Sequence, residues 1–270
     1  MGVYRPNRPM VFPCGIRAPG RRLAQINLVL KNVPGALSKV AQLLGLLRVN
    51  ILSGHITAFP GEELGRMSNF VDLTDTYVTL EELLRRLRAI DVVIEAEGRE
   101  ADLPGIIINT THFPITFMGE EAIIMDVRQI SYMFGRLHEV FESGAYTILY
   151  EMGLMAGRFF AREVREHFSV EGMEALKVIA DFAVARGWCI PEFVEFDEEK
   201  PRLVVRLRDL FECRLFKGRK NKPNSHFMRG ILAGILEELF GVKIKVKEEK
   251  CVAIGDPYCE FVAERYEALE

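Results

Sequence analysis

The chain has 270 residues, of which 49% are hydrophobic and 27% charged, so two domains are expected and extended disorder or a fibrous repeat is excluded. Its 35 basic and 38 acidic side chains give a formal charge of −3, which provides no overall field for binding nucleic acid. The sequence has no apolar run of roughly 18 residues that would span a membrane and no secretory leader. With five scattered cysteines, it predicts a folded cytoplasmic protein.

The first 98 residues predict an arm followed by a small sandwich domain. Residues 1–21 contain prolines and basic side chains, and we interpret them as an N-terminal arm. From Leu23 to Leu30 apolar and polar residues mostly alternate, as in a strand with one buried face. The later patterns predict a helix from Leu37 to about Arg48, strands at 51–59 and 67–73, a helix at 80–89 and a strand at 92–97. The order β-α-β-β-α-β predicts a ferredoxin-like fold.

Residues 22–98 resemble the ACT family of small regulatory domains. The resemblance rests on the loop Asn32-Val33-Pro34-Gly35-Ala36-Leu37 and on the phrase Val49-Asn50-Ile51. Family members commonly bind amino acids beside this loop, so the resemblance implies ligand contacts at Asn32, Gly35, Ala36 and Leu37. This chain has Asn32 where the family usually has Asp. A domain that only dimerises, with Pro34-Gly35 as a simple turn, is the alternative interpretation.

A second domain is expected after a linker at residues 99–114, where Leu103-Pro104-Gly105 interrupts the chain. Residues 115–125 predict a hairpin with its turn at Gly119-Glu120-Glu121. The remaining patterns predict helices at 127–141, 144–168, 170–186 and 226–240, paired strands at 192–197 and 202–207, and two alternating segments at 242–248 and 259–264. The C-terminal domain, residues 115–270, is therefore predicted to be mixed α/β, and the whole chain α+β.

Two cysteines close to the C-terminus enclose a bend. Cys251 and Cys259 flank Gly255-Asp256-Pro257, and a hairpin there would bring Glu248 and Cys251 close to Cys259. The pair could be metal ligands, a redox pair or two buried thiols. The spacing is not the Cys-x-x-Cys arrangement that tunes thiol reactivity, which disfavours redox chemistry. A metal site and a pair of structural thiols both stay open.

Residues 115–270 resemble the 4-vinyl reductase domain family, whose fold is shared with TRAPP-type transport-complex subunits and with the ligand-sensing parts of phenol-responsive activators. The resemblance rests on Gly153 and Gly157, on the segment 230–234 and on the closing motif Glu248-x-x-Cys251-x3-Gly-Asp-Pro-x-Cys259-x-Phe.

In the aromatic-sensing relatives a cysteine, a glutamate and two further cysteines hold a structural zinc. The resemblance therefore implies zinc ligands at Glu248, Cys251 and Cys259. The first family cysteine falls on Ser225, a poor zinc ligand. We consider the neighbouring His226 as its replacement and Cys213 as the less suitable substitute.

The resemblance also implies a central pocket between the helices and the sheet. We expect Phe134, His138, Met152, Met155 and Trp188 to contact a hydrophobic or aromatic ligand there. Apolar residues at helical spacing are otherwise core residues, and Gly153 with Gly157 favours close packing of a second helix.

The sequence contains no nucleotide-binding fingerprint, nucleophile elbow or metalloprotease motif, and no catalytic residue is predicted. The leading hypothesis is a cytoplasmic regulatory homodimer that binds small molecules in one or both domains and acts on a partner protein. The alternatives are an enzyme or enzyme subunit that assists vinyl-group reduction of a tetrapyrrole, and a structural module of a larger complex.

Overall fold

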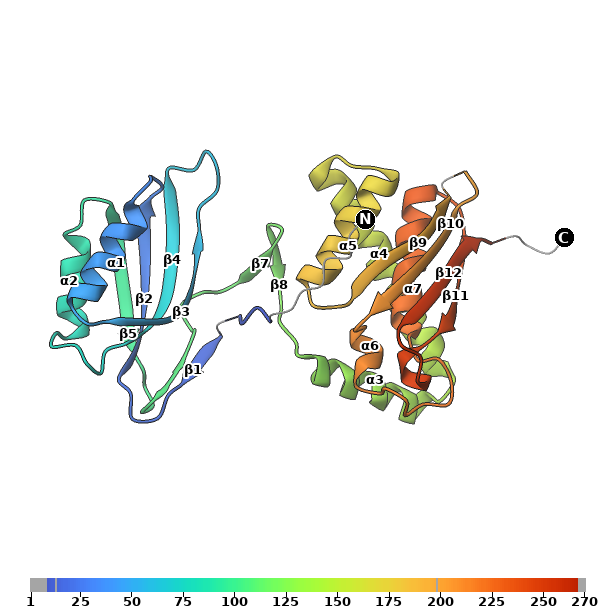
Figure 1. Ribbon diagram of the computed structural model, residues 1–270, viewed down its shortest axis with the longest axis horizontal. Coiled ribbons are helices and arrows are strands. Elements are labelled where there is room, and N and C mark those ends of the chain that lie inside the picture. The colour runs from blue at the N-terminus through green and yellow to red at the C-terminus, as the bar shows by residue number, and fades with distance from the viewer. Residues whose placement is uncertain (1–8, 13, 198, 267–270) are drawn as a thin grey trace. The chain divides into compact units, whose positions relative to one another are not determined.

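The computed structural model describes residues 9–12, 14–197 and 199–266. These residues form two compact units that meet at Ala122 and Ile123, and each is described by itself. The combination of helices with antiparallel sheets confirms the predicted α+β class (Figure 1). No helix among the described residues has the length and apolar character needed to cross a membrane.

The first unit is built on a four-stranded antiparallel sheet with two helices. The strand order β3-β4-β2-β5 and the alternation of strands with helices confirm the predicted ferredoxin-like arrangement. Both helices cover the same face of the sheet (Figure 1). The elements are β2 (Leu23–Lys31), α1 (Ala36–Leu46), β3 (Asn50–Thr57), β4 (Leu64–Asp72), α2 (Leu80–Arg88) and β5 (Val93–Glu100).

The alternating pattern of β2 explains how this sheet binds its helices. Ile26 and Leu28 are buried on the helix side, where they pack with Val40 of α1 and Leu87 of α2. The start of α2 is fixed by Thr79, whose side chain accepts a hydrogen bond from the backbone N–H of Glu82.

The other face of the sheet is covered by residues from the segment expected to be a linker. Strand β6 (Ile106–Ile108) pairs with β1 (Gly15–Arg17), and Ile107 is buried against Leu23 and Phe70. Beyond β6, Asn109 accepts a 3.0 Å hydrogen bond from Gln25 of β2. Residues 99–114 therefore do not form a free linker, because an apolar side chain and an amide hydrogen bond fasten them to the first unit.

A short hairpin ends the first unit. Strands β7 (Ile115–Phe117) and β8 (Glu120–Ala122) pair so that Phe117 faces Glu120. The turn is therefore Met118-Gly119, and not the predicted Gly119-Glu120-Glu121. Both turn residues have positive φ angles, 55° and 88°, as a two-residue hairpin turn of this type requires.

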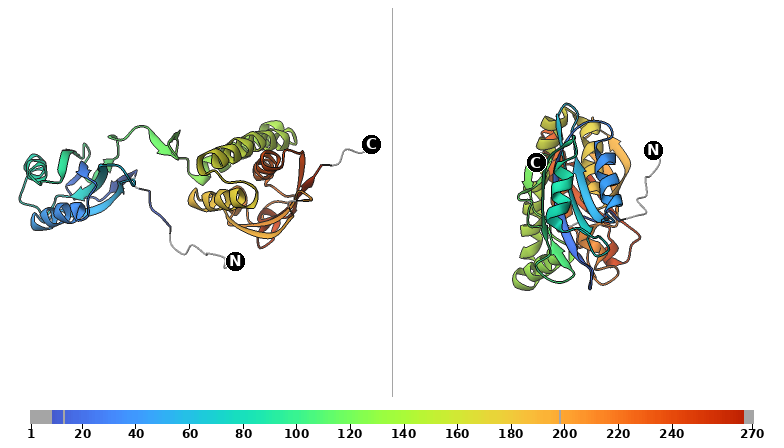
Figure 2. Two further views of the ribbon diagram at one scale, coloured as in Figure 1. Left: turned by 90° about the horizontal axis from the view of Figure 1, so that it is seen from above. Right: turned by 90° about the vertical axis from the view of Figure 1, so that its left-hand side faces the viewer.

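The second unit packs helices on one face of another antiparallel sheet (Figures 1 and 2). Its strand order is β11-β12-β10-β9, with the predicted pairing of β9 and β10. The longer elements are α3 (Val127–Phe141), α4 (Gly144–Phe168), α5 (Gly172–Ala185), β9 (Ile190–Asp197), β10 (Arg202–Arg208), α7 (His226–Phe240), β11 (Ile244–Lys250) and β12 (Cys259–Arg265). Between them lie α6 (Phe211–Arg214) and a short 3-10 turn (Val252–Ile254).

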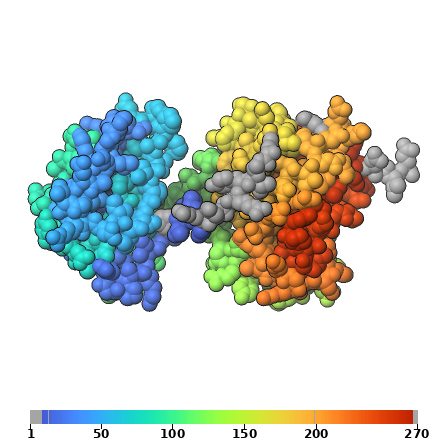
Figure 3. Space-filling model, in the orientation of Figure 1, coloured from blue at the N-terminus to red at the C-terminus, as the bar shows by residue number. Residues whose placement is uncertain are grey.

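The two faces of the second sheet differ in character. Leu203, Val205 and Leu207 alternate along β10 and are buried in the core under the helices. The opposite face is turned toward the viewer in Figure 3 and carries ion pairs, such as Arg202 with Glu195.

Four glycines bring α4 and α7 into close contact. A Cβ atom added to Gly153 or Gly157 of α4 would overlap a backbone carbonyl oxygen of α7. Gly230 and Gly234 of α7 meet carbonyl oxygens of α4 in the same way. The spacing of four residues in each helix therefore serves helix packing, the simpler of the two interpretations of this pattern.

Candidate functional site

Three cysteines and a glutamate converge in the second unit. Cys213, Glu248, Cys251 and Cys259 each place a possible ligand atom within 4.8 Å of the others. Cys213 lies on α6, Glu248 on β11, Cys251 just after β11, and Cys259 at the start of β12. All three cysteines are fully buried and none forms a disulfide. This cluster could hold a metal ion.

The closing bend positions Cys251. The carboxylate of Asp256 accepts a 2.8 Å hydrogen bond from the backbone N–H of Cys251. Gly255 has a φ angle of 110°, which allows the chain to reverse at low conformational cost. The strands that follow and precede the bend pair with each other, so Glu248, Cys251 and Cys259 come together as the motif predicts.

Ser225 occupies the position of the lost family cysteine and has a different role. Its hydroxyl donates a 2.6 Å hydrogen bond to one carboxylate oxygen of Glu248, and its backbone N–H donates to the other at 3.2 Å. It also lies 2.9 Å from the sulfur of Cys213. Ser225 therefore holds the glutamate in place, while Cys213 supplies the fourth donor of the cluster.

The prediction of His226 as a metal ligand is not supported by its position. The His226 ring stacks on Tyr146 with the ring centroids 4.1 Å apart, and it lies near His138. Successive residues of a helix point about 100° apart. Because Ser225 faces the cluster, the next side chain points away from it, and the residue judged less suitable, Cys213, takes its place.

Burial and shared hydrogen bonds control the protonation of the cluster. Burial, followed by the charge of Cys251, raises the pKa of Glu248 to about 9. Side-chain hydrogen bonds from Cys213, and then from Cys259, lower the pKa of Cys251. The sulfur atoms of Cys213 and Cys251 are 3.6 Å apart. Two thiolates on a tetrahedral zinc ion are about 3.8 Å apart, given Zn–S bonds of about 2.3 Å, so the donor set fits this metal.

The start of α7 depends on a buried glutamate next to the cluster. The carboxylate of Glu212 accepts hydrogen bonds of 2.9 Å from the backbone N–H groups of Phe227 and Met228. Burial raises the pKa of Glu212 to about 8. A side chain from α6 therefore caps α7, because the hydroxyl of Ser225 is directed to Glu248.

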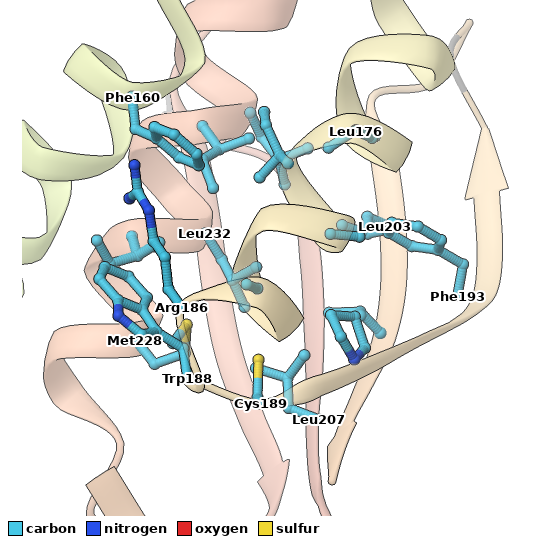
Figure 4. Close-up of a pocket in the computed structure, with 18 residues that line it drawn as sticks. Phe160, Leu176, Arg186, Trp188, Cys189, Phe193, Leu203, Leu207, Met228 and Leu232 are labelled. Carbon is cyan, nitrogen blue, oxygen red and sulfur yellow. The ribbon is translucent and has the colours of Figure 1, made fainter. Parts of the chain in front are cut away.

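An apolar cavity of about 60 Å³ lies between helices α5 and α7 and strands β9 and β10 (Figure 4). Of the 18 residues that line it, Arg186 is the only charged one. The cavity adjoins the cluster through two elements. Met228, in the first turn of α7, lines it, and Leu207 of β10 lies opposite Cys259 in the sheet. The other lining residues are Phe160, Leu176, Ile179, Ala180, Ala183, Trp188, Cys189, Pro191, Phe193, Leu203, Val205, Ile231, Leu232, Ile235 and Leu236.

The residues predicted to contact a ligand in the second unit do not lie in one place. Trp188 lines the apolar cavity. Phe134 and His138 line a smaller cavity of about 40 Å³ beside Glu212. Met152 and Met155 are 49% and 60% exposed on the outer side of α4. Their neighbours Gly153 and Gly157 occupy the buried side of the helix, so the methionines point elsewhere.

Arg186 was missed as a site residue. It directly follows α5, and a basic residue at that position is ordinarily explained by the partial negative charge at a helix C-terminus. Its place on the cavity wall depends on how α5 packs on the sheet. The sequence carries no local signal of that packing.

The predicted ligand loop of the first unit is well ordered by its own contacts. Gly35 has a φ angle of 86° at the start of α1, which explains the glycine. The side-chain amide of Asn32 donates to the backbone carbonyls of Phe59 and Glu62, at 3.1 and 2.9 Å. Asn32 therefore ties this loop to the β3–β4 loop. Ala36 is buried, and Leu37 is 42% exposed.

The closing part of the chain matches a known domain family. The vinyl-4-reductase domain profile matches residues 203–265, so the C-terminal region contains a domain of this family. An uncharacterized protein of Methanocaldococcus jannaschii, MJ0855, is 39% identical over 70 residues, which cover 25% of this chain and 30% of that protein. A second one, MJ0150, is 30% identical over 124 residues, covering 44% and 64%. The chain thus spans less than two thirds of either relative.

Among solved structures, the phenol-responsive sensory domain of the transcription activator PoxR, determined with phenol, is similar with a TM-score of 0.50. It is 18% identical, and the match covers 54% of this chain and 78% of that one. At this identity the similarity concerns the fold.

Proposed function

We propose that this chain is a small-molecule-binding regulatory protein whose vinyl-4-reductase region binds an apolar molecule in the cavity between α5, α7, β9 and β10. The observation that carries the proposal is the lining itself, in which 17 of 18 residues are uncharged and nearly all are apolar. The shared fold of the PoxR sensory domain, which was determined with phenol, supports the same proposal.

The cavity offers a direct way to measure binding. Trp188 is the only tryptophan of the chain and lines the cavity, so its fluorescence reports on occupancy. We expect phenol and 3-methylbutan-1-ol to change this fluorescence in a saturable way. The variant Ala183→Leu fills the cavity and should abolish the change, whereas Ala185→Leu, on the exposed side of the same helix, should not. No saturable change with either compound, or an equal response of both variants, would refute the proposal.

We infer that the cluster is a structural zinc site held by Cys213, Glu248, Cys251 and Cys259. Three thiolates and a carboxylate form a closed tetrahedral set, as structural zinc sites do. Bound zinc would supply a cross-link between α6, β11 and β12. Because Ser225 binds Glu248 at the start of α7, and Met228 one turn later lines the cavity, the site would also brace one wall of the cavity.

For the first unit we propose an ACT-like regulatory role, supported by its strand order and by the Gly35 turn. An amino acid or a similar metabolite is the proposed ligand, and the response would pass through a homodimer to a partner protein. Calorimetric titration with each free amino acid tests the binding. A Gly35→Val variant, strained at its positive φ angle, should lose any signal. Absence of heat with every amino acid would remove this part of the proposal.

A further inference from the structure

A single cation lies on the wall of the apolar cavity. The guanidinium carbon of Arg186 is 3.9 Å from the centroid of the Phe160 ring and 5.8 Å from that of Trp188. Figure 4 shows the side chain extending between these two aromatic groups. The two rings hold the planar guanidinium in a defined position.

The electrostatic surroundings of the cavity favour an anion over a neutral group. The lining contains no aspartate or glutamate that would repel a negative charge. Burial lowers the pKa of Arg186, the direction expected for a cation withdrawn from water. An arginine nevertheless stays protonated in proteins. A negatively charged group bound beside it would offset the cost of its desolvation.

We propose that the ligand of this cavity is a small apolar molecule with a carboxylate group, and that Arg186 binds the carboxylate while the alkyl or aryl part enters the cavity. This inference rests on the proposed function, because it names the ligand class for the same cavity. A guanidinium matches a carboxylate through two parallel hydrogen bonds. Sites for phosphate usually combine several donors, such as further cations or the backbone N–H groups of a helix start.

The volume of the cavity limits the apolar part. A cavity of about 150 Å³ is known to hold benzene, and this one measures about 60 Å³. A short branched alkyl group therefore suits it better than a large ring system. The unbranched side chain of Met228 on the wall is the one best able to rearrange when a ligand enters.

The test compares 3-methylbutanoate with 3-methylbutan-1-ol, which has the same carbon skeleton without the charge. Titrations at neutral pH follow the fluorescence of Trp188. We expect the carboxylate to bind about ten- to a hundredfold more tightly than the alcohol. Arg186→Met, which keeps an unbranched side chain, should remove this preference while the alcohol still binds. Arg186→Lys should retain part of it.

Arg214→Met is the matched control, because Arg214 is exposed and donates to the carbonyl of the neighbouring Gly187 without lining the cavity. This variant should keep the preference. Thermal unfolding of each variant confirms that it is folded. Equal binding of acid and alcohol to the unmodified protein, or a preference that survives Arg186→Met, overturns the inference and leaves the proposed function intact. Failure of both compounds and of phenol to bind overturns the two together.

Discussion

The hydroxyl of Ser225 donates a 2.6 Å hydrogen bond to Glu248, and both side chains lie against the sulfur atoms of the buried cluster. A serine at this position would leave a tetrahedral site with three donors if Cys213 were not present on α6. The structure instead divides the work between two residues. Cys213 completes the set of donors, and Ser225 orients the carboxylate.

The first prediction concerns metal content. Protein purified without added metal or a histidine tag should contain about one zinc ion per chain, as measured by elemental mass spectrometry. Cys213→Ala and Cys259→Ala should lose the metal, because each removes one of four donors. Cys189→Ala removes a buried cysteine outside the cluster and should retain it. Metal loss in His226→Ala, or its retention in Cys213→Ala, would contradict the assignment of the fourth ligand.

The second prediction concerns Ser225. Replacing it with alanine removes the hydroxyl that orients Glu248, so zinc affinity in a competition assay with a chelator should fall by about 10–100-fold. In the metal-free protein the free energy of unfolding should fall by about 1–3 kcal/mol, because a buried carboxylate loses a partner. Ser131→Ala, whose hydroxyl bonds only a helix carbonyl, should change neither quantity appreciably. Unchanged zinc affinity in Ser225→Ala would show that its hydroxyl does not support the site.

The third prediction concerns acid sensitivity. Burial, with smaller effects from Arg229 and His138, lowers the pKa of His226 to about 4. The unfolded chain, with an ordinary histidine pKa near 6.5, then binds more protons than the folded one between these values. The stability due to neutral His226 is therefore present above pH 6.5 and is lost as the pH falls toward 4.

This loss should amount to about 1–2 kcal/mol in the free energy of unfolding, allowing for the partial exposure of the ring. Urea unfolding at several pH values measures it. His226→Phe should flatten the pH dependence in this window, while His167→Phe, at an exposed site, should leave it unchanged. A slope that persists in His226→Phe would assign it to other groups.

The fourth prediction concerns the contact between α4 and α7. Gly157→Ala would place a methyl group onto the carbonyl of Ile231, so the helices must move apart. The expected loss is about 1–3 kcal/mol in the free energy of unfolding. Gly135→Ala is a matched substitution on α3, where an added Cβ meets no atom within 4 Å. It should raise stability by about 0.5–1 kcal/mol through helix propensity, and a similar loss in both variants would be inconsistent with the packing.

Local patterns predicted most of the fold and only part of the site. The alternation in β2 and the turn at Gly35 are properties of neighbouring residues, and they identified the first sheet and its helix correctly. The closing motif likewise brought Glu248 to Cys251 and Cys259, because a hairpin sets their distances. Cys213 reaches the same cluster from a separate helix, and no spacing in the sequence indicates that approach.

The methionines of α4 illustrate a second limit. Helical periodicity groups Met152 and Met155 on one face, but it does not tell which face is buried. The glycines settle the question, because Gly153 and Gly157 match Gly230 and Gly234 in spacing and both pairs permit close backbone contact. Reading the two glycine pairs together would have placed the methionines outside.

The pairing of β1 with β6 has a practical consequence for dissecting the molecule. A fragment trimmed to residues 22–98 would lack both strands, and Leu23 and Phe70 would lose the cover of Ile107. Such a truncated domain would present a sticky apolar surface during expression. A recombinant fragment that runs from residue 9 to residue 122 retains this cover and is the appropriate boundary for studying the first unit in isolation.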